Sequence, residues 1–341
     1  DQQGHWSGFP IVFLDGKPAE FRKNREALEP LTYFLYKDYP KKQGEMRNEL
    51  HNTLYIRLPD GKTPDDVKVE SVDSATNVHV SRSYVTVRNL VSMYSGGDGF
   101  ATTRAKGIVF ENVRGCFNMD QGMSHHGAEV TVINSRFDNN AGCGVVDVYP
   151  ECRTKYLGCV IEDDVFRGGV EFHSGEFEME DCVIRNNTGK ALSVNKDAKV
   201  KLRNCLFISK DAEFQGIAVG GGNLEMTACT VFNAKDGIAG WSLTPQNRIE
   251  VRNCAFVANK TNYSWHGPKD GERPKMLFES NFLTPAPVIF FGKTYKPEQW
   301  DEYRKDSGLD AHSLMKQYDG PLPPNMPPIE VEGGIAGAET K

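Results

Sequence analysis

The chain has 341 residues, of which 39% are hydrophobic, so it can bury one sizeable core. Its formal net charge is -6 at pH 7, and its Lys and Arg residues are scattered without a basic run. This distribution argues against nucleic acid or an anionic membrane surface as the main partner. No apolar stretch approaches the ~20 residues of a membrane-spanning helix. Residues 1–8 lack a signal-peptide pattern, so we expect any export signal to have been removed.

The first part of the chain shows no repeat. Residues 1–66 are expected to form an irregular N-terminal region, which ends in the strand-and-turn sequence TLYIRLPDGKTP.

Residues 67–292 consist of similar segments that recur every 21 to 25 residues. Each begins with alternating apolar residues, as in VTVINS and IEVRNC, and continues through a polar corner into a second strand near a Gly. This period of two predicts strands, not helices. A unit so short must stack on its neighbours to bury its apolar face. The sequence therefore predicts an all-β protein, a right-handed parallel β-helix solenoid of roughly ten coils.

The cysteines support this alignment of the coils. Five of the eight occupy one place in the repeat, at intervals of 23, 23, 24 and 25 residues: Cys159, Cys182, Cys205, Cys229 and Cys254. Apolar residues flank them two positions away, whereas zinc or disulfide chemistry requires other spacings. We expect a column of buried, free thiols and assign no role to Cys116, Cys143 and Cys152.

After the coils, residues 293–341 are expected to cover the open end of the solenoid. A helix-compatible pattern runs over residues 297–317, and the tail PLPPNMPPIEVEGG is expected to be extended or loosely packed.

Alignment of the second strand of each coil predicts which side chains face outward. The column predicted to point inward is Phe100, Met123, Val146, Val170, Leu192, Ile217, Ile238 and Tyr263. Because side chains alternate along a strand, the next residue of each coil should point outward. These residues include Asp147 and Glu171, and a second outward column includes His126, Tyr149, His173, Trp241 and His266.

This register places Asp147 and Glu171 on adjacent coils, about 4.8 Å apart at the backbone. Like charges at that distance raise one pKa, so the pair could divide the acid and nucleophile or base roles of a glycosidase. Carboxyl groups ~5 Å apart match a retaining enzyme. Two solvated acids or a Ca²⁺ site remain the alternatives. A slip of one residue would bury Asp147 and put His125 in place of His126, but an unpaired buried carboxylate is costly.

Other side chains are predicted to lie around this pair. His126 and His173 could transfer protons or bind sugar hydroxyls, which makes them candidate catalytic residues with Asp147 and Glu171. Tyr149 borders the same patch. Trp241 and His266 could stack on sugar rings. Asp98 and Asp120 occupy coil corners at the edge of the same surface, where acidic residues also serve simply to stabilise turns.

The repeated V-x-V-x-N-C-x-F pattern resembles the right-handed parallel β-helix superfamily, which includes pectate-lyase-like enzymes and several glycoside hydrolase families. The resemblance covers about residues 66–292. The flanking sequences DGKPAEF and GKTYKPEQWDEYRKDSGLDAHSL, and GGDGF followed by MDQGMSHH, are similar to those of bacterial secreted members. The resemblance implies that a polymer lies across the outward sheet and that Asp120, His126, Asp147 and Glu171 belong to the site.

Two departures from the superfamily limit the assignment of chemistry. The adjacent aspartates and the Arg-x-Lys element of polygalacturonase-like members have no counterpart on the outward columns, since Asp163-Asp164 falls at a corner. The only basic residue found near those columns is Lys196, which weakens a lyase assignment.

The leading hypothesis is a secreted or periplasmic glycoside hydrolase, expected to be a monomer, that acts on a polysaccharide or oligosaccharide without a cofactor. The second is a polysaccharide lyase, in which His126 or Tyr149 abstracts the proton and the acids hold Ca²⁺. The third is a non-catalytic carbohydrate-binding or adhesive solenoid, whose binding would depend on Trp241.

Overall fold

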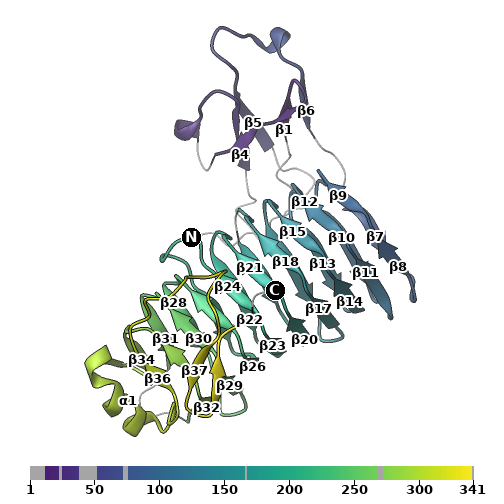
Figure 1. Ribbon diagram of the computed structural model, residues 1–341. Helices are drawn as coiled ribbons and strands as arrows, with labels where there is room; N and C mark the ends of the chain where they lie inside the picture. The colour runs from purple at the N-terminus through teal and green to yellow at the C-terminus, as the bar shows by residue number, and fades with distance from the viewer. Residues whose placement is uncertain are drawn as a thin grey trace.

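The computed structural model describes residues 12–22, 25–37, 52–71, 76–165, 167–267 and 272–339. From residue 76 onward the chain winds through about nine turns of a parallel β-solenoid, as predicted. Each turn contributes one strand to each of three long sheets, and successive turns stack along one axis (Figure 1).

The three sheets are numbered in the order in which the chain meets them. The first sheet contains β7 (Thr76–Val80), β10 (Asp98–Thr103), β13 (Met123–His126), β16 (Cys143–Val148), β19 (Gly168–Phe172), β22 (Lys190–Asn195), β25 (Ile217–Gly220), β28 (Asp236–Trp241), β31 (Thr261–Trp265), β34 (Val288–Phe290) and the antiparallel β35 (Lys293–Tyr295). The second contains β8 (Thr86–Arg88), β11 (Ile108–Glu111), β14 (Glu129–Ile133), β17 (Arg153–Leu157), β20 (Gly175–Glu180), β23 (Ala198–Arg203), β26 (Asn223–Thr227), β29 (Arg248–Arg252) and β32 (Lys275–Glu279). The third contains β9 (Val91–Met93), β12 (Arg114–Cys116), β15 (Arg136–Asp138), β18 (Val160–Glu162), β21 (Val183–Arg185), β24 (Leu206–Ile208), β27 (Thr230–Phe232), β30 (Ala255–Val257), β33 (Phe282–Leu283) and β36 (Leu314–Met315).

The core is a stack of columns inside the solenoid, in which each side chain lies on its counterpart from the turn before. The predicted thiol column is confirmed: the eight cysteines are all free and buried. Thiols of this column also accept hydrogen bonds from the backbone of the turn before: the amide of Cys159 donates to Sγ of Cys182 at 3.4 Å. Burial removes these apolar and thiol groups from water, and this is the main driving force for stacking the turns.

A second buried column fixes the corner between the third and first sheets. Asn118, Asn140, Asp164 and Asn187 are stacked there, each at most 3% exposed. Their side-chain oxygens accept hydrogen bonds from backbone amides one turn earlier, for example Asn140 N to Asp164 Oδ1 at 2.8 Å. Buried corner amides that would otherwise be unpaired are satisfied in this way.

The column also explains a glycine near the start of the first-sheet strand in several turns, although Ala191 takes this place after Asn187. A Cβ added to Gly144 would lie 2.2 Å from Cγ2 of Ile161 and 2.6 Å from Oδ2 of Asp164. At Gly144 only glycine fits beside the side chain of Asp164, so the corner residue and the glycine together help to set where β16 begins.

The described part of the N-terminal region is not irregular, contrary to expectation. It contains β1 (Val12–Leu14), β2 (Lys17–Pro18), β3 (Glu20–Phe21), β4 (Thr32–Lys37), β5 (Asn52–Arg57) and β6 (Val69–Ser71), with 3-10 turns at Arg25–Ala27 and Pro64–Asp66. These strands form two three-stranded sheets, and Val12, Leu14, Tyr33 and Val67 are buried together. β5 falls in the strand-and-turn sequence TLYIRLPDGKTP, where the sequence predicts a strand. β1, β2, β3 and β6 have only two or three residues and carry too little alternation to be recognised in the sequence. The unit adjoins the solenoid where Phe13 meets Tyr94, with ring centroids 4.9 Å apart.

The C-terminal region covers the end of the solenoid, as predicted, but its helix is shorter. A 3-10 turn (Pro297–Gln299) leads into α1 (Trp300–Ser307), which ends at Gly308 in the left-handed conformation (φ 71°). Gly308 is a common type of helix terminator, and the helix does not continue to residue 317. Tyr303 of α1 is completely buried against the core, next to Tyr295.

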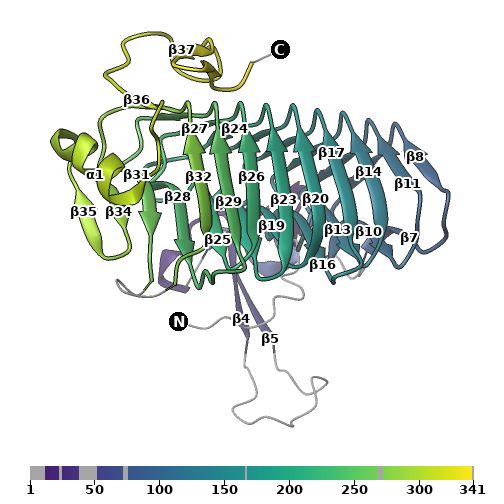
Figure 2. The ribbon, with the colours of Figure 1, turned by 90° about the horizontal axis from the view of Figure 1, so that it is seen from below.

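The Pro-rich tail is packed more closely than expected. It ends in the hairpin β37 (Ile329–Val331) and β38 (Gly334–Ala336), which covers the outer face of the third sheet over its last turns (Figure 2). None of the helices in the described ranges has the length and apolar character needed to span a bilayer.

Candidate functional site

The outer face of the first sheet carries most of the candidate residues. The predicted inward column is confirmed for Phe100, Met123, Val170, Leu192, Ile217, Ile238 and Tyr263, which are at most 1% exposed. Glu171 pairs with Ser193 and belongs to the outward column, as predicted. Trp241 pairs with Gly220 on the second outward column. The outward placement of these residues therefore stands, whereas their roles remain predictions.

Asp147 does not lie on this face, and the prediction that it faces outward is wrong. In β16 the inward residue is Val145, which pairs with Met123 and Val170, so the turn is shifted by one residue from the predicted alignment. Val146 takes the outward place beside Glu171, and Asp147 pairs with His125 and Phe172 inside the solenoid. Asp147 is 0% exposed, so it cannot share a surface site with Glu171.

The buried carboxyl group is nevertheless not unpaired. The hydroxyl group of Tyr156 donates to it, at 3.1 Å from Oδ1 and 3.0 Å from Oδ2. Burial raises the pKa of Asp147 to about 7, although the Tyr156 hydrogen bond opposes the shift. His125 lies beside it, between the rings of Phe110 and Tyr156 at 6.1 and 6.3 Å. Burial lowers the pKa of His125 to about 3, so its imidazole is neutral and accepts or donates at Thr102 Oγ1, 2.8 Å away.

The prediction for Asp147 failed because a pKa of about 7 leaves the buried group protonated about half of the time at neutral pH, which reduces the cost of burying it. A signal for the correct register was present. Asn118 and Gly122 are four residues apart, and so are Asn140 and Gly144. Alignment on these pairs, which lock the corner, would have placed Val145 inward.

Tyr149 is displaced by the same shift. Val148 occupies its predicted place opposite His126, and Tyr149 follows in the corner with φ 85°. The side chain is 54% exposed, and its ring lies 5.9 Å from that of His126. Tyr149 thus still borders the face, although not from the predicted column.

Glu171 is the centre of an ionic group on the outer face. Its Oε2 atom lies 3.0 Å from Nη2 of Arg167 and 3.3 Å from Nε2 of His173. Burial raises the pKa of Glu171, but the His173 hydrogen bond and the charges of Arg167, His173 and Lys190 outweigh it, so the pKa lies below its usual value. Glu171 is therefore an ionised carboxylate at neutral pH.

Asp98 and Asp120 form a second acidic group on the same face, on adjacent turns. The backbone amide of Gln121 lies 3.4 Å from Oδ1 of Asp98, and the Gln121 side chain donates to Oδ1 of Asp120. Burial, followed by the charge of Asp120, raises the pKa of Asp98 to about 7. At neutral pH this pair combines a carboxyl group that retains its proton about half of the time with a neighbouring carboxylate.

The two acidic groups lie on either side of one buried thiol. Cys143 opens β16, which lies between β13 and β19 in the sheet. Burial raises the pKa of its thiol, the charges of Glu171, Asp164 and Asp120 raise it further, and the charge of Arg167 lowers it. Asp98, Asp120 and Glu171 therefore belong to one polar area, which spans the first-sheet strands β10 to β19.

His126 is partly buried at the edge of this area. Its Nε2 atom lies 3.0 Å from Oγ of Ser124. Burial and then the nearby His79 lower the pKa of His126, so the imidazole is neutral at pH 7 and could accept a proton.

Trp241 and His266 lie farther along the solenoid, on β28 and just after β31. The ammonium group of Lys190 lies 5.0 Å from the centroid of the Trp241 ring, a cation–π contact. Nε2 of His266 lies 2.8 Å from Oγ of Ser264. These residues are several turns from Asp98 and Asp120, so they would contact a different part of an extended ligand.

Two basic residues on this face were not predicted from the sequence. Arg167 precedes β19 in a corner that contains an extra residue, and Lys190 opens β22, so neither fell on the aligned columns. The longer spacing from Asp164 to Gly169 was the available signal. In the described ranges, no three His, Cys, Asp or Glu side chains come together in a way that would hold a metal ion.

The fold and this face define the chain as a parallel β-solenoid with a polar, acidic first sheet. The chain belongs to the family described as the right handed beta helix region, whose model matches residues 59–207 and 121–267, more than half of the sequence.

Two solved structures have a similar fold. The pectate lyase Pel9A has 13% sequence identity over 56% of this chain and 53% of its own, with a TM-score of 0.42. The tailspike protein gp49 from Pseudomonas phage LKA1 has 11% identity over 70% of this chain and 50% of its own, with a TM-score of 0.26. The chain thus spans about half the length of these two structures. No curated protein matches it.

Proposed function

We propose that the protein hydrolyses a carbohydrate polymer bound across the outer face of the first sheet. The observation that carries the proposal is the Asp98–Asp120 pair, in which burial and a neighbouring charge raise the pKa of Asp98 to about 7. Glycosidases require one carboxylic acid and one carboxylate on either side of the scissile bond. The pair replaces Asp147 and Glu171 as the proposed centre, since Asp147 is buried.

In this proposal protonated Asp98 donates its proton to the glycosidic oxygen as the bond to the anomeric carbon breaks. The Asp120 carboxylate either removes a proton from an attacking water molecule or attacks the anomeric carbon itself. In the second case water releases the sugar, and Asp98 recovers its proton from that water. Both routes end with one new reducing end for each bond cleaved.

The remaining polar groups would bind and orient the sugar units on either side. Ionised Glu171, held by Arg167 and His173, can accept hydrogen bonds from hydroxyl groups. Neutral His126 and the exposed Tyr149 ring border the same area. A substrate of this kind is met outside the cytoplasm, so we also propose that the protein is secreted or periplasmic and works as a monomer.

A second candidate function is elimination by a polysaccharide lyase, and one observation favours it. Arg167 and Lys190 lie close enough to Glu171 to lower its pKa, so the face offers cations that could meet a uronate carboxylate without calcium. Neutral His126 would then abstract the proton next to that carboxylate as the bond from the next carbon to the glycosidic oxygen breaks, and the leaving oxygen would take a proton from the imidazolium or from water. The product would carry a new double bond and absorb in the near ultraviolet.

The test is to incubate the protein with a panel of polysaccharides and to assay reducing ends and ultraviolet absorbance. We expect reducing ends without absorbance, reduced at least about 100-fold in Asp98→Asn and Asp120→Asn, as for loss of a general acid or base. Glu225→Gln, which alters a carboxylate on the second sheet, is the matched control and should retain full activity.

The other outcomes separate the alternatives. Absorbance that is lost in His126→Ala but retained in Asp98→Asn would identify a lyase. Binding without any change in the polymer, dependent on Trp241, would identify a non-catalytic carbohydrate-binding solenoid. Hydrolysis that survives both aspartate substitutions would refute the Asp98–Asp120 site.

A further inference from the structure

The outer face of the third sheet changes character halfway along the solenoid. One outward column reads Asp138, Glu162, Arg185, Ile208, Phe232 and Val257 from turn to turn. Its apolar end packs against the C-terminal segment, including Met326 and Ala336. Its charged end lies before the turns that this segment covers. The apolar part of the column is therefore covered by the chain itself, whereas the charged part is available to solvent or to a ligand.

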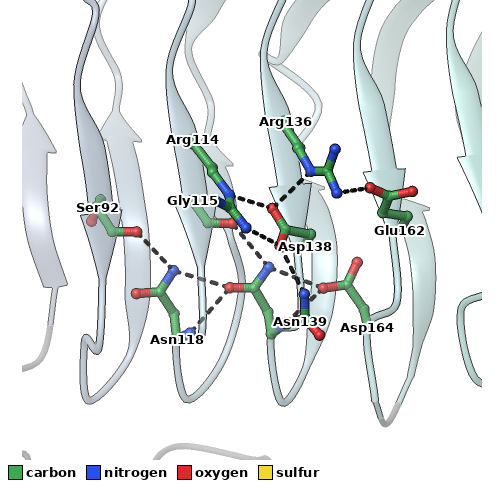
Figure 3. A network of polar contacts seen from close by, with 10 residues as sticks. Ser92, Arg114, Gly115, Asn118, Arg136, Asp138, Asn139, Glu162 and Asp164 are labelled. Carbon is green, nitrogen blue, oxygen red and sulfur yellow. Dashed lines mark hydrogen bonds and ion pairs between the residues drawn. The ribbon is translucent and has the colours of Figure 1, made fainter.

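The charged end is an alternating array of arginines and acids (Figure 3). Arg114 binds Asp138 with two hydrogen bonds, Nε to Oδ1 at 2.8 Å and Nη2 to Oδ2 at 2.7 Å. Arg136 lies between the acids, with Nε 3.2 Å from Oδ1 of Asp138 and Nη2 in contact with Glu162. Nε of Arg185 binds Glu162 from the other side. Asp138 and Glu162 are each shared by two guanidinium groups.

The acids are buried and the arginines are not. The side chains of Asp138 and Glu162 are 0% and 2% exposed, whereas those of Arg114, Arg136 and Arg185 are 41%, 46% and 37% exposed. Burial raises the pKa of Asp138, but the hydrogen bond and charge of Arg114 outweigh it and keep the pKa below its usual value. The two carboxylates thus fix three half-exposed guanidinium groups in defined orientations on successive and nearby turns.

Each arginine retains donors that the acids do not use. In the described ranges no acceptor contacts Nη1 of Arg114, Arg136 or Arg185. Turns are spaced about 4.8 Å apart, so Arg136 lies one turn from Arg114 and Arg185 lies two turns beyond Arg136 along the axis. Planar guanidinium donors match sulfate and carboxylate oxygens, and their fixed orientation lowers the entropy cost of binding.

The charge balance indicates what kind of anion would fit. Three arginines and two carboxylates leave a single excess positive charge, in a chain of net charge -6. Such a surface has too weak a field to attract a densely charged nucleic acid, which is bound mainly by charge neutralisation. Such a surface must instead recognise its ligand through short-range hydrogen bonds to oxyanions, and the ligand would be a polymer that is less densely charged than a nucleic acid.

We propose that Arg114, Arg136 and Arg185 form a second binding surface for an acidic glycan, a polymer that carries sulfate or carboxylate groups along its length. The proposal concerns the third sheet and does not depend on hydrolysis at the first.

The test compares two variants that remove the same charge from different faces. Arg185→Gln removes the last arginine of the row formed by Arg114, Arg136 and Arg185, and leaves Glu162 bound to Arg136. Arg203→Gln removes an exposed arginine that is paired with Glu180 on the second sheet. Binding of dextran sulfate, polygalacturonate and unmodified dextran would be measured by isothermal titration calorimetry at low and at physiological salt.

We expect the wild-type protein to bind at least one acidic polymer but not dextran. Arg185→Gln should weaken that binding about fivefold to tenfold, as for loss of one charge-assisted contact, and Arg203→Gln less than twofold. Arg185→Lys, which retains the charge and an ion pair with Glu162, should lie between the two and guards against a folding defect in the glutamine variant. Equal losses in Arg185→Gln and Arg203→Gln would show only nonspecific attraction and overturn the proposal. So would the absence of binding to both acidic polymers.

Failure of this test would leave the first-sheet proposal untouched. Hydrolysis of a neutral polymer should be the same in Arg185→Gln as in the wild-type protein, because the row lies on another sheet. The two binding surfaces can therefore be tested separately in the same variants.

Discussion

Replacement of the buried Asp147 by Asn should make the protein more stable at alkaline pH. Burial raises the pKa of Asp147 from 3.8 to about 7 in the folded state. Because the folded state binds this proton more tightly than the unfolded state, the stability it provides is complete below pH ~4 and is lost as the pH rises through ~7. A difference of about three pKa units corresponds to about 4 kcal/mol. The side-chain amide of the Asp147→Asn variant would not titrate and could still accept the Tyr156 hydrogen bond.

The measurement is the free energy of unfolding of both proteins in guanidinium chloride at several values between pH 4 and 8. We expect Asp147→Asn to be no more stable than the wild-type protein at pH 4, and about 2–4 kcal/mol more stable at pH 8. The gain could fall below 4 kcal/mol because the side-chain NH₂ group of the Asn would be buried, and its hydrogens need acceptors. His125, with a folded pKa of about 3, and Asp98, with one of about 7, are present in both proteins, so their contributions cancel in the difference.

A difference in stability that stays constant from pH 4 to 8 would refute this reasoning. It would mean that Asp147 does not take up a proton on folding in this range, and hence that the buried carboxylate is satisfied in its charged form.

Three further substitutions test the packing of the corners and of the third sheet. Asn140→Ala removes the hydrogen bonds of Asn140 to Asn118 and to the carbonyl group of Gly115, and should lower the free energy of unfolding by about 2–4 kcal/mol; a loss below ~1 kcal/mol in urea titrations would contradict a structural role for the column. Gly144→Ala introduces a Cβ 2.2 Å from Ile161 and should lower the melting temperature by several degrees, and an unchanged temperature would show that the corner yields easily. Asp138→Asn leaves Arg114 and Arg136 with a neutral partner and should cost about 1–3 kcal/mol, less in high salt; a cost independent of salt would mean that packing matters more than charge.

Much of the fold could be predicted because each turn of a solenoid repeats the same physical problem. The cysteine column and the inward residues of most turns follow from a period of two and an interval of 21 to 25 residues. Their burial depends on neighbours that are copies of the same segment. By contrast, each pairing among the N-terminal strands, such as that of β4 with β5, occurs only once, so the sequence contains no second copy from which to identify these strands.

The error at Asp147 has a different cause. Val145 and Val146 are equally hydrophobic, so hydrophobicity does not show which of them points inward. The free-energy cost of burying Asp147 is also overestimated when its hydrogen-bond partner is not known. That partner, Tyr156, is nine residues away on β17 of the second sheet, and only the closed cross-section of the solenoid brings the two together. A contact across the interior cannot be derived from the period within one strand.

The same limit applies to the arginine row, where the side chains occur in short strands beside polar corners and look like solvated turn residues. Their alignment becomes visible only when Asp138 and Glu162 are found to be buried beneath them. In both places the register is set by the corner residues, Asn140 and Gly144 among them, and not by the apolar residues that follow. Because the corner residues fix the register, an acid such as Asp147 can point into the solenoid. An acid such as Asp138 can equally be buried on the outer face, beneath arginine side chains. Polar residues in these turns therefore have to be placed from the corners before any of them is assigned a chemical role.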